Sequence, residues 1–271
     1  MPENVNSCSV KTFDWQGFQQ FAAPGAHKPR GPVSAMQFAR DQLGFEPDPR
    51  QTEVLESTAK RGILNCTRQW GKSTVAAIKA LHTAHSTPGS LVIVASPGDR
   101  QSAEFLKKTE ELVKRLGITP RGDGKNSCSL MLPNGSRIIG LPGTEQTVRG
   151  FSSVALLLID EAARVADVMY KALRPMLAVA DGDLWMMSTP HGKQGFFYET
   201  WQNGGPAWHR ISVPATQCSR ISKAFLDEEL NATGSASFRQ EYLCEFAEDG
   251  RRMFNPDHLR AALRDIEPLH L

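Results

Sequence analysis

Four short apolar runs, each of strand length, alternate with segments of helical spacing along the middle of this chain. Turn residues or charges bound each apolar run, which is typical of buried strands. The apolar runs are GILNCT at 62–67, LVIVAS at 91–96, VALLLID at 154–160 and LWMMST at 184–189, and the helical patterns cover 72–85, 99–116 and 166–179. This alternation predicts an α/β fold, with a mostly parallel sheet and flanking helices.

Further elements surround this alternation. The segment CSLMLPNGSRII at 128–139 places two short apolar runs around Asn134-Gly135, which predicts an inserted antiparallel β-hairpin. RISVPA at 210–215 predicts one more strand, and 222–246 predicts a small C-terminal helical lid. Two more helices are expected before the first strand, at 34–43 and at 50–61.

Composition divides the chain into four expected parts. Residues 1–32 are rich in Pro, Gly, Asn, Gln and Ser and are expected to form an N-terminal arm, with a short helix around 15–21. The other expected parts are an NTPase core at 33–212, a lid or linker subdomain at 213–255 and a C-terminal tail at 256–271.

Bulk composition excludes several classes of protein. The 271 residues are 40% hydrophobic and 22% charged, which is ordinary for a globular domain. A net charge of +2 is too small to predict nucleic-acid binding, so any DNA contact must come from a local patch. The five cysteines are scattered, which predicts reduced thiols rather than disulfides or a zinc site. No stretch reaches the roughly 18 apolar residues of a membrane span, so a cytoplasmic protein with no membrane association is expected.

The stretch CTRQWGKST at 66–74 resembles a phosphate-binding loop. It follows an apolar run and opens a helix, and only the first glycine of G-x-x-x-x-G-K-[ST] is replaced, by Cys66. Backbone N–H groups would hold the phosphates, Lys72 would reach the β- and γ-phosphates, and Ser73 would bind Mg²⁺. A chance match at a helix start is the alternative. The expected nucleotide-binding residues here are Cys66, Thr67, Gln69, Trp70, Gly71, Lys72, Ser73 and Thr74.

Two acidic residues end the third apolar run. Asp160 and Glu161 follow VALLLI, at the end of a strand where open parallel sheets bind ligands. Asp160 would bind Mg²⁺ with Ser73, and Glu161 would be the general base for the attacking water. An acidic pair can also merely end a strand. Because two strands end in the expected chemistry and in the expected order, we interpret them together as one ATP site.

Four other residues have candidate roles. Ser188 and Thr189 could couple hydrolysis to a neighbouring segment, although the pair taken alone is better explained as a strand-to-turn cap. The amide of Gln51 could pair with adenine, and an exposed helical glutamine is the alternative. Arg68, in the loop, could stabilise the transition state in cis. Arg149 could do so in trans across a subunit contact, although most surface arginines are only solvated.

With these residues in order, the chain resembles the ATPase domain of the large terminase subunit of tailed bacteriophages. The resemblance spans about residues 35–255, and the stretches that carry it are PRQ at 49–51, CTRQWGKST at 66–74, SPGDRQSAEF at 96–105, LPNGSRIIGLPGTEQTVRGFSSVALLLIDEAARV at 132–165, LRPMLAVADGDLWMMSTPHGKQGFFYETW at 173–201 and FRQEYLCEF at 238–246. That family often lacks the first loop glycine.

The resemblance implies a RecA-like ASCE P-loop NTPase that couples Mg-ATP hydrolysis to movement of double-stranded DNA into a procapsid. It also implies a pentameric ring on a portal, a small terminase subunit as partner, and the cytoplasm of an infected or lysogenic bacterium. Arg68 in cis and Arg149 in trans are the implied arginines. Family members continue into a nuclease domain with an acidic metal-binding cluster. No such cluster follows residue 246, so no nuclease activity is expected.

Two other functions remain open from the sequence. The first is a fragment of a superfamily 2-like helicase or translocase, although no second RecA-like domain fits after residue 190. The second is a non-catalytic prophage assembly module, although Lys72, Ser73, Asp160 and Glu161 are intact. Candidate DNA contacts are weak, and a solvated face explains most of them better. These candidates are Lys107, Lys108, Lys114, Arg115 and Lys193.

Overall fold

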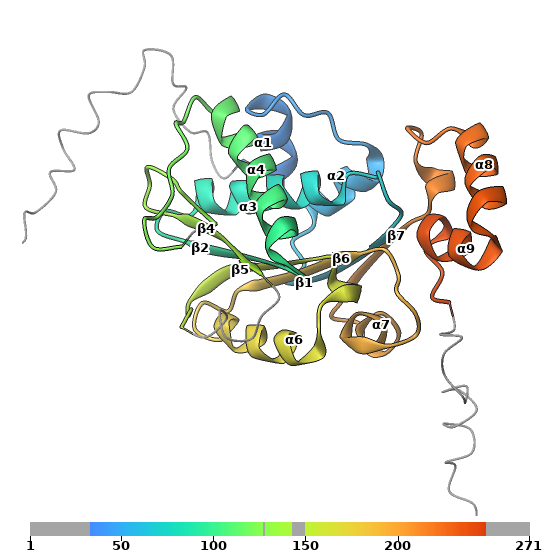
Figure 1. Ribbon diagram of the computed structural model, residues 1–271. Coiled ribbons are helices and arrows are strands. Elements are labelled where there is room, and N and C mark those ends of the chain that lie inside the picture. The colour runs from blue at the N-terminus through green and yellow to red at the C-terminus, as the bar shows by residue number, and fades with distance from the viewer. Residues whose placement is uncertain (1–32, 127, 143–149, 248–271) are drawn as a thin grey trace, which may run out of the picture. The chain divides into compact units, whose positions relative to one another are not determined.

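Seven strands form one sheet in the order β3-β4-β2-β5-β6-β1-β7 (Figure 1). The structure is a computed structural model that describes residues 33–126, 128–142 and 150–247. The strands are β1 (Arg61–Cys66), β2 (Leu91–Ser96), β3 (Ser129–Met131), β4 (Arg137–Pro142), β5 (Val154–Asp160), β6 (Asp183–Ser188) and β7 (His209–Val213). Among the paired strands that the structure describes, β3–β4 is the one antiparallel pair, so the predicted mostly parallel sheet is confirmed.

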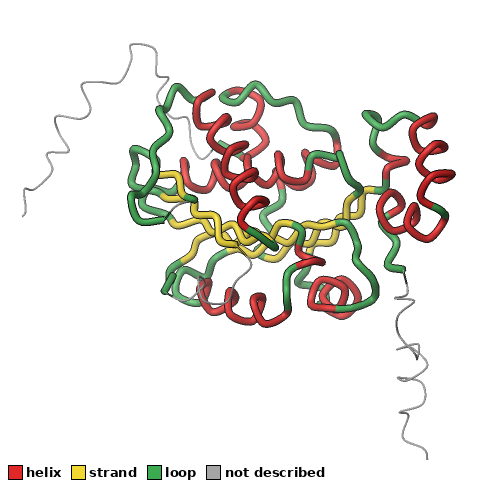
Figure 2. Tube along the Cα trace, viewed as in Figure 1, coloured by secondary structure: helices red, strands yellow, loops and turns green. Residues whose placement is uncertain are grey.

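Helices cover both faces of the sheet. Figure 1 shows α1 to α4 on one face and α6 and α7 on the other, and Figure 2 shows the same layers by type of element. The helices are α1 (Ala35–Asp41), α2 (Pro49–Glu56), α3 (Lys72–Ser86), α4 (Asp99–Arg115), α6 (Asp167–Leu173), α7 (Gly195–Asn203), α8 (Lys223–Thr233) and α9 (Ser235–Leu243), with 3-10 turns η2 (Ala162–Arg164), η3 (Arg174–Leu177) and η4 (Ala215–Gln217). We refer to α8 and α9 as the C-terminal helix pair.

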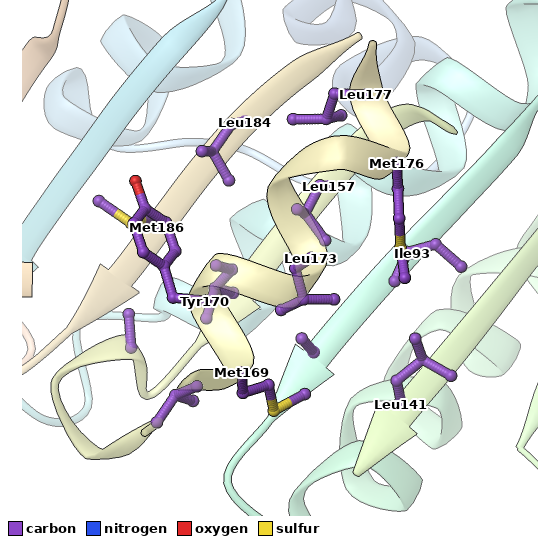
Figure 3. Packing of buried hydrophobic residues seen from close by; sticks show 14 of the residues in the cluster. Ile93, Leu141, Leu157, Met169, Tyr170, Leu173, Met176, Leu177, Leu184 and Met186 are labelled. Carbon is purple, nitrogen blue, oxygen red and sulfur yellow. The ribbon is translucent and has the colours of Figure 1, made fainter. Parts of the chain in front are cut away.

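The strands are apolar on both faces because both faces are covered. Side chains on one face, such as Leu157 and Met186, pack against α6 and η3 through Leu173 and Met176 (Figure 3). On the other face, Trp185 of β6 lies opposite Gly62 of β1, where a Cβ atom would lie only 2.2 Å from the indole ring. The glycine is therefore needed for the close approach of a large side chain.

The antiparallel pair forms at the predicted Asn-Gly turn. Gly135 has a φ of +81° and its N–H bonds with the carbonyl of Leu132 at 3.0 Å. The side chain of Asn134 donates to the carbonyl of Ala84 at 2.8 Å, which ties the turn to the end of α3. β4 also pairs in parallel with β2, so one strand of this hairpin belongs fully to the central sheet.

Three helical expectations differ in detail from the structure. The helix expected at 166–179 is divided into α6 and η3, because Pro175 cannot donate the next helical hydrogen bond. The helix expected at 50–61 ends at Glu56, and β1 already begins at Arg61. The segment 222–246 is divided by Gly234, whose φ is +79°. Helix α7 was not among the predicted elements.

The described residues from Ser34 to Ala247 belong to one compact unit. The arm at 1–32 with its expected helix, the end of the lid segment and the tail at 256–271 lie outside the described residues. The core and lid boundaries therefore stay predictions. Within the described part of the chain, no helix is both long and apolar enough to cross a bilayer.

Candidate active site

The carboxyl ends of three neighbouring strands meet at one edge of the sheet. β6 lies between β1, which leads into the loop at 66–74, and β5, which ends at Asp160. These three strands place Cys66, Asp160 and Ser188 at the edge where open α/β sheets bind ligands. The sheet therefore brings together the loop, the acidic pair and the Ser-Thr pair that were separate motifs in the sequence.

The structure explains why the loop at 66–74 tolerates residues that are unusual in a phosphate-binding loop. Cys66 is the last residue of β1 and is fully buried, so no positive φ requires the expected glycine there. Trp70 is bulky but points into the core, with 1% exposure. Gly71 has a φ of +99°, and a Cβ atom on it would lie 3.0 Å from Nε2 of Gln51. The backbone therefore requires a glycine at position 71 but not at position 66.

Lys72 opens α3 and is buried against the loop. Its Nζ donates to the carbonyl oxygens of Cys66 and Thr67, at 3.3 and 3.1 Å. The ammonium therefore lies within the curve of the loop, at the N-terminus of a 15-residue helix. Backbone N–H groups and a positive charge at a helix N-terminus form an anion site.

Ser73 and Asp160 are direct neighbours. The Ser73 hydroxyl donates to Oδ2 of Asp160 at 3.3 Å. Burial, followed by the nearby Glu161 charge, raises the pKa of Asp160 to about 6. A hydroxyl beside a buried carboxylate is a pair of hard oxygen ligands, and Mg²⁺ is commonly held by one or two such groups. These residues therefore fit the expected metal.

Glu161 begins a sharp turn directly after β5. Its φ of +50° is in the left-handed region, which costs a glutamate on the order of 1 kcal/mol and is characteristic of functional sites. Its Oε2 accepts a hydrogen bond from Nη1 of Arg164 at 3.1 Å, and the same nitrogen donates to Oγ1 of Thr189 at 3.1 Å. The candidate base and a candidate coupling residue thus share one arginine. Ser188, next to Thr189, is buried.

Arg68 is exposed, and a residue of the C-terminal helix pair binds its guanidinium. Its Nε donates to Oε2 of Glu241 at 2.7 Å, and this hydrogen bond raises the pKa of the guanidinium. Gln69 is exposed beside it and has a φ of +61°. Thr67 is buried and donates to the Glu241 carbonyl at 3.2 Å. Thr74 lies in the first turn of α3, and its N–H donates to the carbonyl of Gly71 at 3.0 Å.

Gln51 is buried rather than exposed, at 1%. Its Oε1 accepts from the Asp48 N–H at 3.0 Å and caps α2, and its Nε2 donates to the carbonyl of Trp70 at 3.0 Å. Arg220 also donates to the carbonyl of Trp70. Both ends of the amide therefore support the phosphate-binding loop in this structure, and adenine contact by Gln51 stays a prediction.

A cavity of about 410 Å³ opens over these groups, and a second of about 310 Å³ continues toward α4. Seven of the fifteen expected site residues line them, together with side chains of α4, and these seven are Arg68, Gln69, Gly71, Lys72, Ser73, Asp160 and Glu161. The first cavity is lined by Arg68, Gln69, Gly71, Lys72, Ser73, Gln101, Lys108, Glu161 and Arg164. The volume and the cationic lining suit a polyanion.

Three of the candidate DNA contacts, Lys108, Lys114 and Arg115, have different surroundings. Lys108 lines the cavity, Lys114 pairs with Glu110 at 2.9 Å, and Arg115 donates to the carbonyl of Leu43 at 3.0 Å. These contacts favour the structural explanation over DNA contact for Lys114 and Arg115. The expected trans arginine, Arg149, lies outside the described residues, so its role stays a prediction.

Comparison with known proteins identifies the family. A family model described as "Terminase large subunit, T4likevirus-type, N-terminal" matches residues 63–261. The chain belongs to the terminase large subunit family. The large terminase of Thermus phage G20c is 26% identical over 251 residues, which cover 79% of this chain and 51% of that protein. The chain therefore spans about half the length of the curated terminases it matches.

Solved structures of terminases share the fold. The large terminase ATPase domain of Thermus phage P74-26 has a TM-score of 0.70 and 25% identity, over 80% of this chain and all of that one. The large terminase of a thermophilic bacteriophage, solved in complex with ADP, has a TM-score of 0.64 and 12% identity, over 74% of this chain and 54% of that one. The predicted RecA-like fold of a terminase ATPase domain is confirmed.

The structure also contains contacts that the sequence does not predict. Arg164 and Glu241 connect the candidate base, the loop and the C-terminal helix pair. Arg164 follows Glu161 by three residues, a spacing that places two side chains on one face of a helical turn. Glu241 gave no such signal, because its partners are distant in sequence. For Gln51 the sequence does contain a signal, because Asp48 and Gln51 have the spacing of a capping box, and the structure contains one.

Proposed function

We propose that this chain is an ATP-hydrolysing motor domain of a viral DNA-packaging terminase. The observation that carries the proposal is the meeting of Lys72, the Ser73–Asp160 pair and Glu161 around one cavity at the carboxyl edge of the sheet. The complex of the thermophilic phage terminase with ADP supports a nucleotide as the ligand. Membership of the terminase family supports DNA packaging as the process.

The loop residues bind and orient the phosphates. Backbone N–H groups of the loop and the first turn of α3 would surround the β-phosphate. Lys72 would exchange its hydrogen bonds with the Cys66 and Thr67 carbonyls for phosphate oxygens. Ser73 and Asp160 would hold Mg²⁺, whose charge offsets that of the phosphate oxygens.

Glu161 is placed to activate the attacking water. Among the described residues, its Oε2 is bonded only with Arg164, which leaves Oε1 for a water molecule. The water oxygen bonds to the γ-phosphorus while the bond to the bridging oxygen breaks, and the water proton passes to Glu161. ADP and inorganic phosphate are the products. The Nη groups of Arg68 would stabilise the charge on the equatorial oxygens in cis, and Arg149 would add a second guanidinium in trans.

The larger assembly is part of the same proposal. We infer that several copies form a ring on a portal, with a small terminase subunit as partner, and move double-stranded DNA with each hydrolysis. Thr189, which shares Arg164 with Glu161, would pass the change in the site to the rest of the chain. The isolated domain would bind DNA weakly, because a ring presents several patches at once.

The test is ATP hydrolysis per chain, measured against protein concentration with Lys72→Ala as the blank. We expect activity above the blank that rises steeply with concentration, because one site then uses an arginine from a neighbour. Activity that is real but independent of concentration would remove the trans role of Arg149 and leave Arg68 alone. Activity no higher than the blank at any concentration, with and without DNA, would contradict the proposal and favour an assembly module.

A further inference from the structure

One carboxylate of the C-terminal helix pair holds two arginines of the site. Oε2 of Glu241 accepts from Nε of Arg68 at 2.7 Å, and Oε1 accepts from Nη2 of Arg164 at 3.1 Å. The main-chain carbonyl of Glu241 also accepts from Thr67 of the phosphate-binding loop at 3.2 Å. Burial alone would raise the pKa of Glu241, but the Arg68 hydrogen bond and both arginine charges outweigh it and lower the pKa. The residue is therefore ionised and tied to the loop by both its side chain and its backbone.

Arg164 continues this chain of contacts to the candidate base. Its Nη1 donates to both Glu161 and Thr189, while its Nη2 holds Glu241. One planar guanidinium thus joins the turn after β5, the end of β6 and α9. Such a fork fixes the direction of its partners as well as their distance.

Glu161 depends on this arginine for its orientation. Its side chain is 32% exposed, and within the described ranges Arg164 is the one side chain that hydrogen bonds with its carboxylate. A partly exposed glutamate without such a partner would sample several rotamers. A general base works only when one oxygen is held within hydrogen-bond reach of the attacking water.

Arg68 depends on Glu241 in the same way. Its side chain is 59% exposed, and it lines the cavity while its Nε is bonded with the helix pair. Fixing Nε leaves the two Nη groups for phosphate oxygens. An exposed arginine that lacked this anchor would spend much of its time pointing into solvent.

From these contacts we propose that Arg164 and Glu241 are positioning residues for hydrolysis. Glu241 orients Arg68 toward the phosphates and, through Arg164, fixes the carboxylate of Glu161. The C-terminal helix pair is then a required part of the hydrolytic site, and a movement of α9 changes both groups together. This inference rests on the proposed ATPase function, and it concerns the hydrolysis step rather than nucleotide binding.

The decisive substitution is Glu241→Gln. Glutamine has the same shape, but it offers one acceptor oxygen and one donor nitrogen, so it cannot accept from both arginines. Arg164→Lys is the second variant, since one ammonium cannot hold three partners in a plane. Glu245→Gln is the matched control, because Glu245 follows the same helix pair and pairs with Arg239 at 2.6 Å on its exposed side.

The measurements are the single-turnover rate of ATP hydrolysis and the affinity for a fluorescent ATP analogue, all at one protein concentration. We expect Glu241→Gln and Arg164→Lys to lower the rate by about tenfold or more, the size of effect that loss of catalytic positioning produces. Their nucleotide affinity should stay within about threefold, because Lys72 and the loop backbone bind the phosphates. Glu245→Gln should match the parent in both. Glu241→Asp, which keeps two acceptor oxygens, should recover part of the lost rate.

Three results would overturn the inference. The first is a parental rate for Glu241→Gln, which would mean that the contact does not matter for hydrolysis. The second is a faster rate, which would mean that Glu241 restrains Arg68 instead of orienting it. The third is an equal loss in Glu245→Gln, which would indicate a general effect on the helix pair. If the parent hydrolyses no more ATP than Lys72→Ala, the ATPase function itself fails, and this inference fails with it.

Discussion

The hydroxyl of Ser73 lies 3.3 Å from a carboxylate oxygen of Asp160, although 87 residues separate the two in sequence. One group opens the helix after the phosphate-binding loop and the other ends β5, so the order of the strands creates this contact. Because both are hard oxygen ligands and Asp160 is buried, a cation is the partner that such a pair accommodates best.

Ser73→Ala should therefore selectively weaken the affinity of the site for Mg²⁺. We expect the Mg²⁺ concentration for half-maximal hydrolysis to rise by at least about tenfold. This is the lower end of the loss in metal affinity that follows removal of a group supporting a metal site. Binding of nucleotide without metal should change little. Ser86→Ala, at the exposed far end of the same helix, is the control. Equal Mg²⁺ requirements for the two variants would show that Ser73 is not a ligand.

Glu161→Gln should separate binding from hydrolysis. The amide keeps the size of the side chain but cannot accept the water proton, so the rate should fall by roughly 10² to 10⁴. Nucleotide affinity should remain near that of the parent, because the carboxylate does not bind the phosphates. The measurement is single-turnover hydrolysis beside equilibrium binding, with Glu110→Gln on the outer face of α4 as control. A parental rate would mean that another group is the base.

The buried Lys79 should make the stability of the fold rise with pH in the alkaline range. Its side chain is 8% exposed, its ammonium lies 4.3 Å from the centroid of the Trp185 ring, and burial lowers its pKa from 10.5 to about 8. The folded state then binds fewer protons than the unfolded state between pH 8 and 10.5. Stability from this group therefore rises with pH through that window, and below about pH 8 the full penalty of the buried charge is present.

Lys79→Met should accordingly stabilise the protein at about pH 7 by up to about 3 kcal/mol, the free energy of a pKa shift of this size. The lost contacts with Trp185 and with the carbonyl of Ser57 reduce that gain. The advantage should disappear as the pH approaches the ordinary pKa of lysine. Thermal unfolding of both proteins across that window measures this, with Lys107→Met on the exposed face of α4 as control. Parallel pH profiles for Lys79→Met and the parent would contradict the assignment.

Gly62→Ala should destabilise the sheet without touching the active site. A Cβ atom at this position would lie 2.2 Å from the ring of Trp185, so β1 and β6 would have to shift or the indole would have to leave its rotamer. We expect a loss of about 1–3 kcal/mol, which is typical of overpacking in a core. Gly122→Ala is the control, because its Cβ would meet Ser129 at an ordinary 3.6 Å. Equal unfolding free energies for the two variants would contradict the packing argument.

The sequence predicted the parts of this protein that depend on local patterns. The strands of the central sheet and the Asn134-Gly135 turn follow from short-range spacing, and the structure contains them. The chemical roles of the residues at 66–74 and 160–161 also follow from short-range spacing, and they stay predictions. The order of the strands, which places β6 between β1 and β5, does not follow from local spacing. Contacts between residues that are distant in sequence therefore cannot be predicted from local spacing. The Arg164–Glu241 pair spans 77 residues, and the Arg220–Trp70 contact spans 150.

Burial and helix packing explain why Gln51 and Lys108 differ from their predicted positions. Gln51 was expected at an exposed helical position or on adenine, yet it is buried because its amide fits between the cap of α2 and the loop carbonyl. Lys108 was considered for DNA, yet it lines the cavity because α4 packs beside β2 and β4 with that face toward the site. Neither outcome follows from residue type and spacing alone, since both depend on which helix lies next to which strand.

Arg149 is best tested by complementation, because it lies outside the described residues and its proposed role joins two copies. Arg149→Ala lacks the donated arginine and Glu161→Gln lacks the base, so each alone should be nearly inactive. In an equal mixture, a copy with an intact Glu161 can stand beside a copy with an intact Arg149. Random assembly in a ring of head-to-tail contacts predicts about a quarter of the parental rate. Recovery near that level would support an arginine supplied in trans. A mixture no more active than the average of its components would mean that Arg149 does not reach a neighbour, and that Arg68, oriented by Glu241, supplies the guanidinium within its own chain.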